Sequence, residues 1–193
     1  MKKKHRKSSG VKASGSGQSK ERTKDRSELV HFNIRKNTNL NKLKQDLLRE
    51  SKKNNPNAIL LLIHIGFNFS FKEIEKFEKY IIDNKINVTV RAIGNVDFTV
   101  MAMVIFLSTY HTFFSDETSI LMRTFNPITE AEIKRIIKRI SKIMVCDEKE
   151  LMKYYKEKAM IAPSKIFEKE DEGYVERQNM NPIQIDGSYY KRR

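Results

Sequence analysis

The sequence is short of cysteine, proline, glycine and tryptophan. Its 193 residues include one cysteine, four prolines, seven glycines and no tryptophan. The single cysteine, Cys146, excludes an intrachain disulfide and a cysteine-rich metal site, and we expect no metal and no cofactor. Since no apolar run reaches the roughly 18 residues of a membrane span, we expect no membrane contact. Because the basic N-terminal segment also lacks the apolar stretch of a secretory signal, we expect a cytoplasmic protein.

Positive charge is abundant but gathers at the two ends of the chain. The formal net charge is +14 at pH 7, and residues 1–27 supply +8 of it with ten Lys or Arg against two acids. The last three residues, Lys191, Arg192 and Arg193, add +3, which leaves +3 for everything between. This distribution argues against a basic groove across the core and points to the ends for contacts with anions.

Composition divides the chain into three parts. Residues 1–27 are largely Lys, Ser and Gly and bury too little apolar surface to offset chain entropy, so we expect a disordered basic tail. Residues 28–176 are expected to form one domain, and residues 177–193 a flexible C-terminal tail. The N-terminal basic run is either a solvated tail or a weak, salt-sensitive contact with nucleic acid or an anionic surface.

Apolar patterning predicts an alternation of strands and helices before Gly94. Residues 58–65 form a continuous apolar run, which is typical of a strand buried on both faces. The expected elements are strands at 29–34, 58–65 and 87–93, and helices whose capping residues are Thr38 and Ser70. Two successive β-then-α units predict a parallel sheet with right-handed crossovers, and therefore an α/β fold.

After Gly94 the pattern becomes more helical. Residues 97–110 are apolar on all sides, which indicates a helix buried at the centre of the domain. Thr129 and Glu132 form a capping-box pattern at the start of an amphipathic helix. The other expected elements are a strand pair at 111–115 and 119–122, and helices at 147–158 and 163–172.

This order of elements resembles the Clp protease proteolytic subunit (ClpP) family of the ClpP/crotonase fold. In that family a buried strand ends in Ser-Pro-Gly-Gly, Gly-x-Ala-Ala-Ser-Met-Gly opens a buried apolar helix, and a strand pair delivers Met-x-His. Gly94 aligns with the first glycine of the nucleophile motif, and residues 172–176 are similar to the closing Tyr-Gly-Leu-Ile-Asp. The resemblance covers roughly residues 29–176 and implies a layered fold with a parallel sheet and flanking helices.

The residues that carry the chemistry of the family are replaced. Alignment on Gly94 puts Phe98 at the nucleophile and Arg123 at the catalytic histidine. The third acid would fall within residues 154–158, where there is no Asp. Phenylalanine has no nucleophilic atom, and arginine does not lose its proton near neutral pH. The resemblance therefore implies a protein without a catalytic triad.

The loop that would hold an oxyanion has also changed. Gly66, Phe67, Asn68 and Phe69 align with Ser-Pro-Gly-Gly. Paired glycines let backbone N–H groups approach an oxyanion or a peptide, whereas two phenyl rings would fill that space. We therefore name no catalytic residue in this loop.

Three functions remain open. The first is a catalytically inactive ClpP-like protein that acts as a structural or assembly subunit of a Clp-type protease system, as a homo-oligomer or with an active Clp-type subunit. The second is a serine-type endopeptidase of the Clp family with a displaced nucleophile, for instance Thr99 with His64 as base. The third is a nucleic-acid-associated protein that binds through its basic tails.

Overall fold

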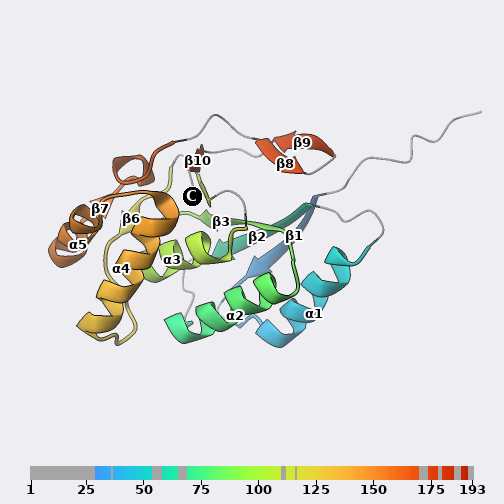
Figure 1. The fold of residues 1–193 in the computed structure, drawn as a ribbon, viewed down its shortest axis with the longest axis horizontal. Helices are drawn as coiled ribbons and strands as arrows, with labels where there is room; N and C mark the ends of the chain where they lie inside the picture. Colours follow the sequence, from blue (N-terminus) through green and yellow to red (C-terminus); the bar gives the residue numbers. More distant parts are fainter. Residues whose placement is uncertain are drawn as a thin grey trace, which may run out of the picture.

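The computed structural model is a mixed α/β fold with a large sheet, a small sheet and a separate two-stranded ribbon (Figure 1). The described residues are 29–35, 37–53, 58–64, 69–109, 112–115 and 117–169, together with the backbone of strands at 174–177, 180–184 and 188–190. The predicted basic tail at 1–27 lies outside these residues.

The large sheet confirms the predicted parallel arrangement. Its strands, in spatial order, are β1 (Leu29–Ile34), β2 (Ala58–His64), β3 (Val88–Ile93), β5 (Thr112–Phe114) and β10 (Ser188–Tyr190). The first four run parallel to their neighbours, and β10 pairs antiparallel with β5. The apolar run that predicted β2 has its physical reason here, since Leu61 and Ile63 are fully buried between β1 and β3.

Helices α1 (Leu40–Ser51) and α2 (Phe71–Asp83) lie side by side along the large sheet (Figure 1). The Tyr80 hydroxyl of α2 donates a hydrogen bond to the Lys44 carbonyl oxygen of α1 at 3.0 Å. Ser70 caps α2 as predicted, in a reciprocal capping box with Glu73. The start of α2 is therefore fixed by short-range polar contacts.

The predicted cap of α1 was wrong by one residue. Asn39 is the N-cap, and its side-chain oxygen accepts from the backbone N–H groups of Asn41 and Lys42. Thr38 turns away to accept a hydrogen bond from the Arg35 N–H at 2.7 Å. Both residues suit an N-cap, and this turn before the helix decides between them.

Helix α3 (Phe98–Leu107) is buried on every side, which confirms the prediction of a central helix. It packs against α2, β3 and a further helix, α4 (Glu130–Met144). Its first turn is capped by Asp97, whose carboxylate accepts from the Val100 N–H at 2.8 Å. Phe98, the first residue of α3, is thus held at the centre of the domain.

Strands lie at both predicted positions, 111–115 and 119–122, but their expected pairing was wrong, because they belong to different sheets. Strand β5 lies beside β3 in the large sheet. Strand β6 (Ile120–Leu121) lies between β4 (Val96–Asp97) and β7 (Met160–Ile161) in the small sheet. The chain therefore repeats one unit twice, a large-sheet strand, a small-sheet strand and a helix: β3–β4–α3 and β5–β6–α4.

Helices α4 and α5 (Glu148–Glu157) lie at the opposite end of the fold from α1 (Figure 1). The predicted Thr129–Glu132 capping box opens α4. Val145 ends α4 with φ 53°, in the left-handed region. Among the described residues, no helix is long and apolar enough to cross a membrane.

Ion pairs join α4 to α2 above the central helix. Arg139 binds Glu78, a buried residue, and its guanidinium lies 4.2 Å from the centroid of the Phe106 ring in α3. Arg135 binds Glu75 at 2.5 Å. The two outer helices are therefore tied together across α3 by charge as well as by apolar contact.

The segment after α5 differs from its prediction. Instead of a helix at 163–172, the described part contains a single 3-10 turn, Pro163–Lys165. The helix does not continue because Ile166 and Phe167 turn into the core, where the Phe167 ring stacks on Phe114 at 6.1 Å between centroids.

Three short strands lie in the C-terminal region, within and just before the segment 177–193 that was predicted to be a flexible tail. Strands β8 (Tyr174–Arg177) and β9 (Met180–Gln184) form the antiparallel ribbon. Strand β10 then returns to the large sheet beside β5. The partner of β10 is distant in sequence, which explains why local pattern did not predict this strand.

Candidate functional site

The candidate site lies where the small sheet meets the first turn of α3. Gly94 has φ 77°, in the region that favours glycine, and it turns the chain from β3 into β4. Strand β4 pairs with β6 in parallel register, Asp97 opposite Leu121. The backbone N–H of Phe98 donates to the carbonyl oxygen of Arg123 at 3.1 Å. The two positions that the sequence singled out are therefore adjacent in space.

The side chain of Phe98 is part of the core. It is 0 % exposed, and its ring centroid lies 6.0 Å from that of Phe71 and 4.9 Å from that of Tyr155. Phe71 opens α2, directly after the loop at 66–69, and Tyr155 lies on α5 within the segment at 154–158. Position 98, the backbone at Arg123 and the segment at 154–158 thus meet, and an aromatic cluster fills the junction.

A small pocket opens beside this cluster. It has a volume of about 390 Å³ and is lined by Arg123, Thr124, Phe125, Tyr155 and Lys158. The Arg123 guanidinium stacks over the Phe125 ring at 4.6 Å, and the Thr124 hydroxyl donates to the Asn126 carbonyl oxygen at 3.0 Å. Two cations at a concave surface can bind an anionic group such as a carboxylate.

The polar residues on either side of position 98 do not form a catalytic pair. Asp97 is engaged as the cap of α3, and burial raises the pKa of its carboxyl, opposed by hydrogen bonds from Val100 and Thr99 and by the charge of Arg123. The Thr99 hydroxyl is buried and has no hydrogen-bond partner among the described residues. An alkoxide needs a base within reach, and the described surroundings of Thr99 contain none.

The loop at 66–69 is described only at its end. Gly66, Phe67 and Asn68 lie outside the described residues, as does the side chain of His64. Phe69 is half-buried, and its carbonyl oxygen accepts a hydrogen bond from the Asn126 side-chain amide at 3.2 Å. This bond places the end of the loop next to the segment that carries Arg123.

Other groups that could act as a nucleophile or a base are those of Ser108, Thr109, His111 and Cys146. The Ser108 hydroxyl donates to the Val104 carbonyl oxygen at 2.7 Å, and the Thr109 hydroxyl donates to that of Val88 at 3.0 Å. Cys146 is half-buried, and burial raises the pKa of its thiol to about 11, which leaves little thiolate for nucleophilic attack. His111 lies outside the described residues.

Sequence reasoning missed the residues that complete the pocket. Thr124, Phe125 and Lys158 come from two connections, and neither their spacing nor their types signalled a site. In the described part of the chain, no group of three or more His, Cys, Asp or Glu side chains is placed to hold a metal ion. The arrangement can bind an anion, and its described side chains provide no nucleophile with a base.

No protein-family model matches the sequence, and no curated protein matches it significantly. The structure itself shows a mixed α/β fold with a parallel sheet, and an aromatic junction at the start of the central helix.

Proposed function

We propose that the chain is a ClpP-like protein without peptidase activity that acts as a structural or assembly subunit of a Clp-type protease system. One observation carries the proposal: the backbone N–H of Phe98 donates to the carbonyl oxygen of Arg123, and the buried ring of Phe98 packs on the ring of Tyr155. Three segments aligned with a catalytic triad converge on one point, and their side chains include no hydroxyl–imidazole pair.

The order of elements also supports this proposal. The two predicted β-then-α units lead through Gly94 into a central apolar helix, as the resemblance implies. Strands β5 and β6 do not pair with each other, which is a departure from the expected pattern.

A role in assembly fits what the pocket offers. Arg123 and Lys158 give it positive charge, so it would bind an acidic side chain or a chain-terminal carboxylate of a partner subunit. The apolar face of α2 is mostly buried and leaves Ile82, which is 62 % exposed. We therefore place the partner contact at the pocket rather than on α2.

Two measurements on the full chain test this proposal. A fluorophosphonate probe should leave the protein unlabelled under conditions in which an active Clp proteolytic subunit is labelled. Native mass spectrometry should show an oligomer, either alone or after mixing with that subunit. Arg123→Ala should weaken this association, and Lys72→Ala on the exposed side of α2 is the matched control.

Specific outcomes would contradict the proposal. Labelling of the chain by the fluorophosphonate would show a working nucleophile and favour the displaced-nucleophile peptidase; loss of that label in Thr99→Val would identify the residue. A monomeric mass both alone and in the mixture would remove the assembly role.

A further inference from the structure

A second concave surface lies between α4 and α5, away from the Phe98 junction. It has a volume of about 730 Å³ and an apolar floor at the half-buried Met152. Six of its lining side chains are cations, contributed by both helices: Lys134, Arg135, Lys138, Lys149, Lys153 and Lys156. We call this surface the α4–α5 groove.

Two of the six cations are already neutralised by acids outside the groove. Lys134 pairs with Glu130 at 2.9 Å, and Arg135 pairs with Glu75. The other four form no ion pair with any residue that the structure describes: Lys138, Lys149, Lys153 and Lys156. The groove therefore keeps four exposed cations whose charge is available to a ligand.

The spacing of these lysines favours an extended anion. Lys149, Lys153 and Lys156 recur at i, i+4 and i+7, so they lie along one face of α5. Four residues of helix rise by about 6 Å, so the charges form a row over about two turns, with Lys138 across the groove on α4. The two acids of the groove, Glu148 and Glu157, are the first and last residues of α5 and leave the row between them uninterrupted.

We propose that the α4–α5 groove binds the phosphate backbone of nucleic acid without regard to sequence. A row of point charges suits a ligand with regularly repeated phosphates. The groove has no aromatic side chain on which a base could stack, and no Asn or Gln to read a base edge. The net charge of +14 adds a long-range attraction for a polyanion. A short acidic peptide carries fewer charges, so it would be attracted less strongly.

This inference is independent of the proposed function, because the groove shares no lining residue with the pocket at Arg123 and Lys158. It also corrects the expectation that only the ends of the chain concentrate positive charge. The mild net charge of residues 28–190 conceals a local excess, since the groove lining has six cations and two acids.

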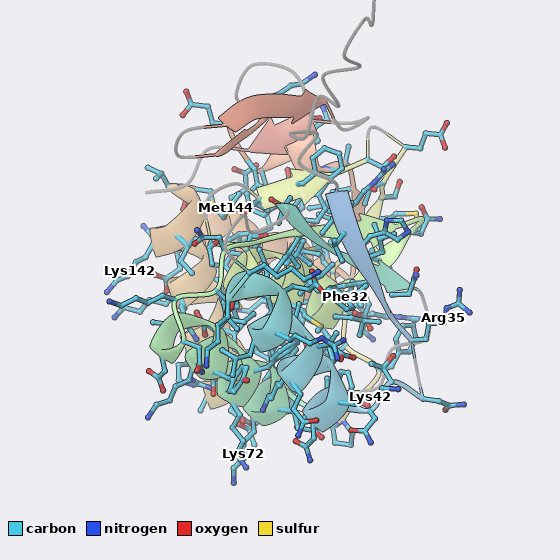
Figure 2. All side chains as sticks on the ribbon, turned by 90° about the vertical axis from the view of Figure 1, so that its right-hand side faces the viewer. Phe32, Arg35, Lys42, Lys72, Lys142 and Met144 are labelled. Atoms are coloured by element: carbon cyan, nitrogen blue, oxygen red, sulfur yellow. The ribbon has the colours of Figure 1, made fainter. Side chains whose placement is uncertain are left out.

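The test compares two full-length variants with the same change in net charge. The groove variant replaces four groove lysines by glutamine: Lys138→Gln, Lys149→Gln, Lys153→Gln and Lys156→Gln. The control variant replaces four exposed lysines of α1 and α2: Lys42→Gln, Lys72→Gln, Lys76→Gln and Lys79→Gln. Lys42 and Lys72 project outward from that side of the molecule (Figure 2). All eight positions are exposed, so both variants should fold.

Binding is measured by fluorescence anisotropy with a labelled duplex of about 20 base pairs and arbitrary sequence, between about 50 and 200 mM salt. Four phosphate contacts contribute about −3.6 to the slope of log K against log salt, which is about a 150-fold loss over that range. The groove variant should therefore have a slope shallower by about 3.6 and a markedly higher Kd at low salt, whereas the control should keep a slope close to that of the parent.

Three outcomes would overturn the proposal. Equal losses in both variants would mean that net charge alone attracts the duplex. An unchanged Kd and salt slope in the groove variant would show that other parts of the chain bind the duplex. Groove-dependent binding of a poly-glutamate peptide without groove-dependent binding of the duplex would identify an acidic protein segment as the ligand.

Discussion

The aromatic junction at position 98 predicts a large loss of stability on truncation of the ring. Phe98→Ala would remove a side chain that is 0 % exposed and packs on the rings of Phe71 and Tyr155. A buried Phe→Ala substitution costs about 3–5 kcal/mol, because it loses transfer free energy and leaves a cavity. We expect a value near 4 kcal/mol here, since the ring has aromatic neighbours on two sides, each worth ~1 kcal/mol.

Urea unfolding followed by circular dichroism measures this free energy of unfolding, and thermal unfolding measures the matching shift in Tm. For a domain of about 150–250 residues, each kcal/mol shifts Tm by about 2–4 °C, so the variant should melt roughly 10 °C lower. Phe125→Ala is the matched control, because Phe125 is 67 % exposed and stacks only with the Arg123 guanidinium among its described ring contacts. Its cost should stay below about 1 kcal/mol.

The comparison also separates a core ring from a binding-site ring. If Phe98→Ala costs less than about 1 kcal/mol, or no more than Phe125→Ala, then the ring at 98 does not fill the core. The space at position 98 would then be open to a ligand, which would contradict the proposal that the protein has no peptidase activity. Phe98→Ser adds a chemical check, because a hydroxyl beside Arg123 still has no base and should stay unlabelled by fluorophosphonate.

Three further predictions follow from the surrounding structure. Arg139→Ala should lower the free energy of unfolding in urea by about 2 kcal/mol, because it removes the guanidinium that binds the buried Glu78. Strict additivity in a double-mutant cycle with Glu78→Gln would contradict this ion pair. Val145→Gly should raise stability by about 1 kcal/mol, because it relieves a β-branched residue at φ 53°; a lower Tm would refute this strain. Cys146 should react with iodoacetamide at pH 8 about 100-fold more slowly in the folded protein than in urea. Burial raises the pKa of its thiol from 9.0 to about 11, which depletes the reactive thiolate. Equal rates would show that the folded protein does not shield the thiol.

Local signals in the sequence were sufficient where an element is specified by its own residues. The helix caps at Ser70 and Thr129 are contacts over three residues, and both were predicted and found. The apolar run of β2 and the all-apolar α3 predicted buried elements, because no other environment accommodates such surfaces. The coarse α/β fold follows from these signals together.

Prediction failed where the outcome depends on distant partners. Strands β5 and β6 are close in sequence, yet one pairs with β3 and the other with β4 and β7. Phe167 leaves the expected helix to stack on Phe114, a contact across more than fifty residues. The groove lysines escaped notice because a count of net charge discards position, and only the packing of α4 against α5 gathers them.

The complete burial of α3 has a consequence for how the molecule opens. A helix with one solvated face can fray or detach while its neighbours persist, but α3 contacts the sheet and both α2 and α4. Exposure of its amides requires separation of both layers at once. Hydrogen exchange in α3 should therefore proceed only through global unfolding, so that the slowest amides of this helix report the stability of the entire domain.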